Sequence, residues 1–588
     1  MKLGIACGLI VFVALVTRVR AVDDPPGGAK AEDAKLAGFF RTFLDASFAA
    51  QPLLATQYGD HRFDDRLDDL SADARAANLK RLRETRADLP QKVAYQSLSR
   101  DGQIDFEILT HHLDREIWLD EHFHPFEDDP RTYGAYLTDS VYLILSQSTL
   151  PKATNLKNVI ARMGKIPAVV DVARKTIKTP PRVRVETAIR QTEGAINFYK
   201  TEIYELTGEP AGKGPLGERA EAIVKALAEH VTFLKNEVLP RSNDSWRIGP
   251  ELFARKLELE LDAGLSAAEV LSEAEAEADR VEREMAVVAR ILWAEMFPKA
   301  AVPTDDPVGR RAMTAKVLAE IAKDHGTPES LVGDAKATVA DIKTFIKQKD
   351  ILALPEPDKC RILEMPEFKR GVSVAYLESA PPLDPTGSSE YAISPPPSDW
   401  DAKKVASYLG EYNKAMLKVL TIHEAYPGHY VQLEYANRCP SLIRRVLSSG
   451  TFAEGWAVYT ERMMLDQGFG AGDLRLRLQQ MKFYLRAVVN AILDHKMHCG
   501  DMTDAQAMEL LVGRAFQTEG EALGKIVRSK LSSCQLSTYF VGRVAFHRLR
   551  QSTQREQADT FSLGRYHEAV LSHGTLPVKY LPELVRRK

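Results

Sequence analysis

Residues 421–432 read TIHEAYPGHYVQ and place two histidines, His423 and His429, six positions apart. On an ideal helix six positions amount to roughly 600°, so the second side chain points about 120° away from the first. The two imidazoles therefore cannot hold one metal ion from a regular helix. Pro427 has no N–H to donate and Gly428 tolerates unusual backbone conformations, so both lie where a distortion is needed. The stretch predicts a helix that breaks between the histidines and brings them together.

Glu424 directly follows the first histidine, in the place that the general base occupies in HExxH zinc peptidases. Such a base accepts a proton from a water molecule that the metal has acidified. A catalytic zinc site has three protein ligands and keeps one position open for water. Because His423 and His429 supply two ligands, a third must come from elsewhere in the chain.

A second motif, TFAEGWAVYTE at residues 451–461, offers that ligand. Glu454 follows His429 at a separation that allows a helix, a turn and a returning helix. Glu461 lies two turns further along the same helix face, where it can accept a hydrogen bond from a ligand histidine. The two motifs together predict Zn2+ held by His423, His429 and Glu454. The alternative is an ordinary surface helix with two carboxylates.

The composition is that of a soluble globular protein, with 45% apolar and 27% charged residues among 588 and a net charge of −3. A chain of this length favours two or more subdomains. Its Lys and Arg residues form no clustered stripe, which argues against a nucleic-acid partner. The cysteines form no CxxC pair and no GxSxG elbow is present, so a zinc ribbon and serine or cysteine hydrolysis are disfavoured.

The N-terminus is typical of an export signal. Lys2 supplies a positive end, an apolar run extends over residues 3–17, and Val19-Arg20-Ala21 fits the small-x-small cleavage rule. We therefore expect a signal peptide at residues 1–21 and a flexible linker at 22–34, with the mature protein in the periplasm or outside the cell. The alternative is an uncleaved anchor. No later segment is long and apolar enough to span a bilayer.

The remaining chain is expected to be mainly α-helical. Residues 35–350 form an N-terminal helical region, in which Ser266 and Glu269 make a capping box that opens one long helix through Leu292. Residues 361–397 are rich in Pro and Gly and contain short alternating runs, which predicts a small β element directly before the histidine motif. Residues 351–588 form the catalytic, zinc-binding region.

At these motifs the chain resembles the bacterial domain of unknown function 885 family. The family's HEAxPGH signature is matched by residues 423–429 and its EGWAxYxE segment by residues 454–461. Further matches are Gly59–Asp65 to GDxRFDD, Asp494 and His498 to DTGxH, Gln535 and Tyr539 to PGQALxY, and Tyr566-His567 to an aromatic-His pair. The sequence departs from the family at Ser533-Cys534 and His495-Lys496, which replace Pro-Gly and Thr-Gly. The likeness covers nearly the whole mature chain.

The family is similar to the helical gluzincin zinc peptidases, such as the thimet oligopeptidase and carboxypeptidase Taq groups. This resemblance implies His423, His429 and Glu454 as ligands, Glu424 as base, and a mainly helical fold with a central cleft. Helical peptidases of this kind use a C-terminal Tyr or His to stabilise the oxyanion. The candidates here are Tyr539, His498 and His567, and each is otherwise a core residue with a satisfied polar end.

The sequence thus predicts an exported, zinc-dependent metallopeptidase that acts on short peptides. Two alternatives remain open. One is a binding or envelope protein with a vestigial metal site, and the other is a zinc amidase or esterase.

Overall fold

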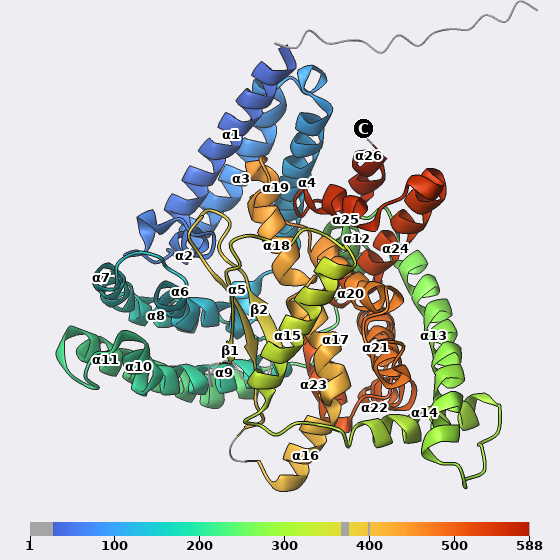
Figure 1. Cartoon of the computed structure of the whole chain (residues 1–588). Helices are drawn as coiled ribbons and strands as arrows, with labels where there is room; N and C mark the ends of the chain where they lie inside the picture. Colours follow the sequence, from blue (N-terminus) through green and yellow to red (C-terminus); the bar gives the residue numbers. More distant parts are fainter. Residues whose placement is uncertain (1–27, 366–374, 398–399, 587–588) are drawn as a thin grey trace, which may run out of the picture.

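The computed structural model describes residues 28–365, 375–397 and 400–586. The predicted signal peptide, residues 1–21, lies outside this range. The chain is mainly helical with one small sheet, as expected (Figure 1). Within the described part, none of the helices combines the length and the apolar character needed to cross a membrane.

An N-terminal group of long helices projects from one end of the molecule (Figure 1, blue). Helix α1 begins at Gly28, so residues 28–34 are helical and the expected linker at 22–34 is wrong there. Distant backbone amides hold this polar segment: Ala94 N–H donates to Glu32 and Ser99 N–H donates to Asp33. The helices of this group are α1 (Gly28–Ala50), α2 (Pro52–Gln57), α3 (Ala72–Lys92) and α4 (Arg100–His122).

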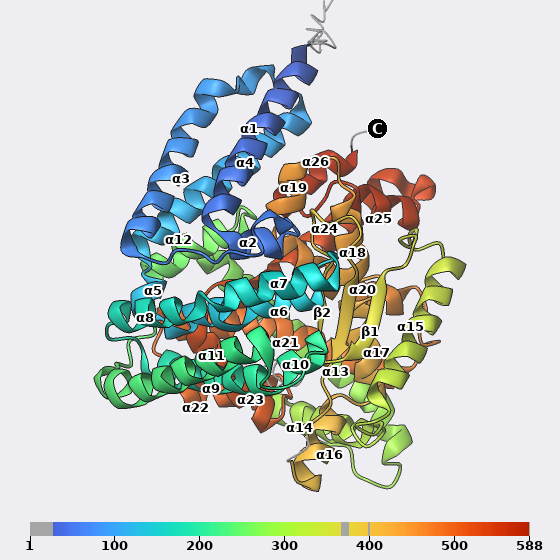
Figure 2. The same ribbon diagram turned by 90° about the vertical axis from the view of Figure 1, so that its left-hand side faces the viewer.

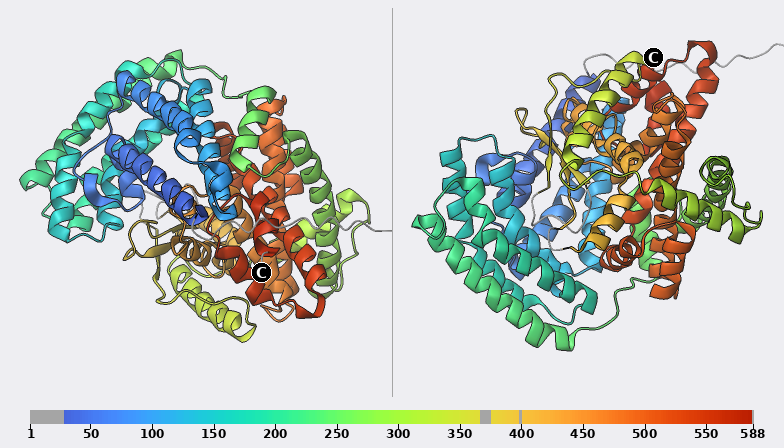
Figure 3. Two further views of the ribbon diagram at one scale, coloured as in Figure 1. Left: turned by 90° about the horizontal axis from the view of Figure 1, so that it is seen from above. Right: turned by 60° about the horizontal axis from the view of Figure 1, so that its bottom comes forward.

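A second group of helices has its own apolar core and lies on the far side of the molecule from α13 and α14 (Figures 2 and 3). The GDHRFDD segment joins this group to the rest. In that segment the Phe63 carbonyl accepts from the Arg162 guanidinium of the second group at 3.1 Å, and the His61 Nε2 atom lies 3.5 Å from an Asp384 carboxylate oxygen near the sheet. The helices are α5 (Pro125–Asp128), α6 (Ser140–Ser146), α7 (Lys152–Met163), α8 (Ile166–Thr176), α9 (Arg182–Lys200), α10 (Glu202–Thr207) and α11 (Gly214–Phe233).

The long helix α13 (Ala267–Met296) starts at the predicted Ser266 capping box, which is confirmed. It packs along α21 (Leu474–Cys499), and side chains of both helices share one apolar core. The predicted boundary at residue 350 therefore cuts through a core and does not separate two folding units. Neighbouring helices are α12 (Pro250–Leu261), α14 (Pro307–Ile321), α15 (Leu331–Gln348), α22 (Asp504–Met508) and α23 (Glu519–Leu531).

The small sheet lies directly before the histidine motif, as predicted. Its strands are β1 (Cys360–Glu364), β2 (Ala375–Glu378) and β3 (Ser389–Ile393). The order is β1-β3-β2, with β1 parallel and β2 antiparallel to β3. Every residue of β3 is buried, and Tyr391 contacts Thr421 through their hydroxyls at 3.1 Å. This contact fixes the sheet against α17 (Lys414–Glu424).

The helices around the motif pack at close range. A Cβ atom added to Gly455 of α20 (Gly450–Asp466) would come within 2.4 Å of the Gly542 Cα in α24 (Thr538–Gln557). The two backbones therefore touch, which explains the glycine in the EGW motif. The remaining helices here are α16 (Ala402–Glu411), α18 (His429–Asn437), α19 (Leu442–Val446), α25 (Leu563–Leu571) and α26 (Leu581–Arg586).

Candidate metal centre

The predicted helix break is confirmed. Helix α17 ends at Glu424 and α18 begins at His429. A Cβ on Gly428 would lie 1.9 Å from the His423 carbonyl oxygen, so only glycine allows this close approach of the backbone. Trp456 of α20 donates from its indole N–H to the Pro427 carbonyl at 2.8 Å. The break places the two histidine rings 4.9 Å apart between centroids.

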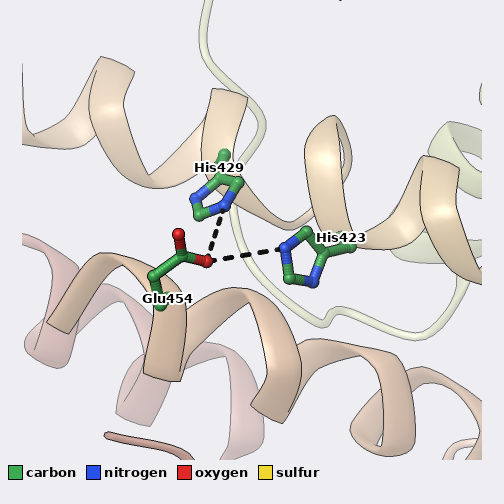
Figure 4. A group of neighbouring side chains, drawn as sticks. All are labelled: His423, His429 and Glu454. Atoms are coloured by element: carbon green, nitrogen blue, oxygen red, sulfur yellow. Dashed lines mark ion pairs between the residues drawn. The ribbon is translucent and has the colours of Figure 1, made fainter. Parts of the chain in front are cut away.

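Three side chains from this break and from α20 converge on one point (Figure 4). The Nε2 atoms of His423 and His429 lie 3.7 Å and 3.4 Å from the Glu454 Oε2 atom. Two ligands of one tetrahedral zinc ion, each about 2.0–2.1 Å from it, are roughly 3.4 Å apart. The Glu454 Oε2 atom is buried and has no hydrogen-bond partner among the described residues. The donor set and its spacing therefore fit a metal ion.

The charges of the group also favour a cation. Burial acts to lower the pKa of His423, but the nearby carboxylates of Glu454 and Glu461 outweigh it and raise that pKa to about 10. Burial acts to raise the pKa of Glu454, and the two histidines reverse this and lower it strongly. Without a metal, a proton on His423 balances the carboxylate charges. A divalent cation can take the place of that proton.

Glu461 contacts His423, as predicted. Its Oε1 atom lies 2.8 Å from the Nδ1 atom of His423, and its side chain is fully buried. A carboxylate only accepts, so the Nδ1–H donates and the Nε2 atom is left to face Glu454. Gln480 of α21 donates to the second oxygen of Glu461 at 3.5 Å. Glu461 thus fixes both the tautomer and the orientation of the ring.

Glu424 lies at the end of α17, beside His423, His429 and Glu454. Burial raises the pKa of its carboxyl, while His423 and His429 act to lower it. The Leu377 N–H of strand β2 also hydrogen-bonds to it. The sheet therefore holds Glu424 in place, and its raised pKa suits a group that accepts and returns a proton.

Tyr539 of α24 lies close to this group. Burial raises the pKa of its hydroxyl to about 12, and the charge of Glu454 contributes to that rise. The hydroxyl oxygen lies 3.3 Å from the Arg528 guanidinium and 3.4 Å from the Gln535 amide nitrogen, both of which donate to it. Its own proton is left to donate elsewhere, which is what an oxyanion donor requires.

The structure does not bring His567 or His498 to the group formed by His423, His429 and Glu454. His567 bonds Ile351 O through Nδ1 and the Tyr459 hydroxyl through Nε2, each at 2.8 Å. Both of its nitrogens are engaged, and burial lowers its pKa to about 3. His498 bonds the carbonyls of Ser529 and Ser532 at the end of α23. The hydrogen bonds of both histidines go to neighbouring protein groups, so both lie in the core rather than at the candidate site.

His498 shares its buried surroundings with Asp494, and this carboxyl predicts a pH-dependent stability. Burial raises the pKa of Asp494 to about 7, against roughly 4 in an unfolded chain. Between these values the unfolded state binds fewer protons, so rising pH favours unfolding. We expect the free energy of unfolding to fall by on the order of 4 kcal/mol across this window, relative to Asp494→Asn.

Denaturant titrations of the wild type and of Asp494→Asn between pH 4 and 8 measure this difference. Asn keeps an acceptor for the Cys534 N–H, which donates to Asp494 at 3.1 Å. Asp473→Asn is the matched control, because Asp473 begins the same helix but is exposed. A constant difference between wild type and Asp494→Asn over the whole range would contradict the assignment.

Sequence reasoning missed three side chains near the group. Phe483 of α21 lies 5.7 Å from the His423 ring, and Arg486 and Lys525 lie beyond it. Of the three, only Lys525 could have been noticed from the sequence pattern. It falls on the buried face of α23, in a row with Ala522, Ile526 and Ser529.

The fold and the site define a mainly helical protein with a partly buried His–His–Glu group beside a small mixed sheet. The chain belongs to the DUF885 family of bacterial proteins of unknown function, whose model matches residues 52–585. This confirms the resemblance drawn from the motifs.

Two solved structures are similar to this chain. One is a "putative lipoprotein of unknown function" from Shewanella oneidensis, with 30% identity, a TM-score of 0.79, and coverage of 94% of this chain and 100% of that one. The other is a "putative lipoprotein" from Colwellia psychrerythraea, with 17% identity, a TM-score of 0.73, and coverage of 94% and 98%. The second likeness shows the fold alone. No protein with a curated description matches the chain.

Proposed function

We propose that this protein is an exported zinc metallopeptidase that hydrolyses short peptides. The observation that carries the proposal is the convergence of two imidazoles and one carboxylate, with ligand atoms within 4.8 Å of one another and Glu424 beside them. Two histidines and a glutamate are a donor set of catalytic zinc in peptidases, with one position left for water or substrate. His429 and Glu454 are partly exposed, at 14% and 21%, so the group is accessible from solvent.

Each residue has a defined task in this reaction. Zinc, when bound, would polarise the substrate carbonyl and acidify a water molecule. Glu424 accepts the proton of the attacking water and passes it to the leaving amine. Tyr539 donates a hydrogen bond to the carbonyl oxygen as negative charge develops there. Glu461 keeps His423 in the tautomer that presents Nε2.

The arrangement of elements supports a gluzincin-like site. A helix carrying the first histidine and the base, a break, a second histidine and a returning helix with the glutamate follow one another in α17, α18 and α20. We extend the proposal to a substrate cleft at this point, bordered by β2 and by the helices α21, α23 and α24.

Export rests on the apolar N-terminal run and on the relative from Shewanella oneidensis, whose name describes a "putative lipoprotein". The periplasm or the cell exterior is therefore the proposed location, and peptides there are the proposed substrates. Cys7 precedes most of the apolar run, so we do not extend lipid attachment to this chain.

The test is a panel of internally quenched peptides given to purified protein, alongside p-nitrophenyl esters and small amides. We expect peptide cleavage that a chelator abolishes and added Zn2+ restores. Preference for the esters or small amides would favour the amidase or esterase alternative. Bound zinc without turnover of any substrate would favour a vestigial site.

A further inference from the structure

Lys525 is an unusual residue on the buried face of α23. Its exposure is only 7%, and it lies among Ala522, Ile526 and Ser529. Its ammonium makes no hydrogen bond and no ion pair with any residue in the described ranges. An unpaired ammonium in so enclosed a place destabilises the folded protein. Residues that destabilise the fold in this way are expected at functional sites, where they bind a ligand.

The neighbouring charges do not supply a partner. Glu521, one turn earlier on α23, bonds the Arg486 guanidinium at 3.1 Å and the Tyr412 hydroxyl at 2.6 Å. Burial and repulsion from Arg486 and Arg528 hold the pKa of Lys525 well below its usual value. Lys525 therefore lies beside two arginines, and the nearest carboxylate, that of Glu521, is already engaged by Arg486 and Tyr412. An additional anion would complete this cluster.

The cluster borders the metal group. The His423 ring lies 5.7 Å from the Phe483 ring, and the Arg486 guanidinium lies 5.6 Å from the same ring. These two contacts put the guanidinium at most about 11 Å from the imidazole, the length of roughly three extended residues. On the other side, Arg528 donates to the Tyr539 hydroxyl, and the charge of Glu454 acts on both Lys525 and Tyr539. Lys525 thus lies in the neighbourhood of Glu454 and Tyr539, on the side of the group that faces α23 and α24.

We propose that Lys525, with Arg486 beside it, binds a carboxylate of the peptide substrate within a few residues of the cleaved bond. The carboxylate is either the free C-terminus or an acidic side chain. This inference rests on the proposed peptidase function and narrows it to substrates that carry a carboxylate close to the scissile bond.

The experiment compares zinc-loaded wild type with Lys525→Met, which removes the charge and keeps the length. Lys530→Met is the matched control on the same helix, because Lys530 pairs with Asp504 at 2.6 Å. The substrates are one peptide as the free acid, as the C-terminal amide, and with Glu replaced by Gln near the cleavage point. We expect the preferred carboxylate to raise kcat/KM by about 10- to 100-fold, the size of a charged hydrogen bond.

Lys525→Met should remove that preference while Lys530→Met keeps it. Loss on amidation identifies the C-terminus as the source, and loss on Glu-to-Gln exchange identifies the side chain. A wild type that cleaves all three peptides equally, or a Lys525→Met that keeps the preference, overturns the inference and leaves the peptidase proposal intact.

Binding separates the inference from the proposed function. Calorimetry with acetyl-trialanine and its C-terminal amide, and with the Glu and Gln peptides, uses zinc-loaded Glu424→Gln, with and without Lys525→Met. Carboxylate-dependent binding that Lys525→Met abolishes supports the subsite even if no peptide is cleaved. The melting temperature of Lys525→Met should equal or exceed that of wild type, since an unpaired buried charge is removed. A marked decrease would assign Lys525 to the fold and overturn the inference.

Discussion

Replacing Glu424 by glutamine is expected to lower kcat for peptide hydrolysis by about 10²- to 10⁴-fold, while zinc content stays near that of the wild type. Glutamine keeps the shape and can still accept the hydrogen bond from Leu377, but it cannot accept a proton from water. Because Glu424 is a neighbour of the ligands and not one of the three, the metal should remain bound.

Steady-state kinetics on the peptide that the wild type cleaves best, with metal analysis of the same samples, measures both quantities. Glu434→Gln is the control, since Glu434 is a buried carboxylate on the adjacent helix α18 whose nearest cation is Arg438. Its kcat should stay within a few-fold of wild type. Full activity in Glu424→Gln would remove Glu424 from the role of base.

Replacing Glu454 by alanine is expected to have the second large effect, the loss of the metal itself. The substitution removes one of three ligands and leaves two imidazoles, which hold zinc weakly without a carboxylate. Zinc content should fall from near one per chain to roughly a tenth of that or less. Glu461→Gln keeps a hydrogen-bond acceptor at the His423 Nδ1 atom and should weaken binding by about 10- to 100-fold, less than the loss of a ligand.

Thermal stability gives an independent test of whether Glu454 binds zinc. A ligand that binds only the folded state stabilises it by about 2.7 kcal/mol at a concentration 100-fold above its dissociation constant. Added Zn2+ should therefore raise the melting temperature of the metal-stripped wild type and leave that of Glu454→Ala unchanged. Equal zinc content and equal shifts in both proteins would show that Glu454 is not a ligand.

The candidate site could be predicted in part because its signals are local. The six-residue spacing of His423 and His429 demanded a break, and Pro427-Gly428 supplied one. Glu454 and Glu461 share one face of a single helix, so the contact of Glu461 with a ligand histidine followed once that face met α17.

The local sequence pattern could not decide which candidate oxyanion donor lies near Glu454. Tyr539, His498 and His567 were all candidates in the sequence, yet among them only Tyr539 lies where Glu454 affects its pKa. His567 found partners in Ile351 and Tyr459, and His498 in carbonyls of α23. These partners lie far away along the chain, and local patterns in a single sequence do not predict which distant residues come into contact.

The sequence by itself determined the break in the motif, the capped helix at Ser266 and the β element before His423. Each of these depends on backbone preferences within a few residues, which hold wherever the segment lies. Only the tertiary structure decided that α13 and α21 share a core, that residues 28–34 are helical, and that Lys525 lies buried without a partner. Those features depend on which elements pack against each other in the folded chain. Burial and charge pairing are set by this packing and not by the sequence of any one segment.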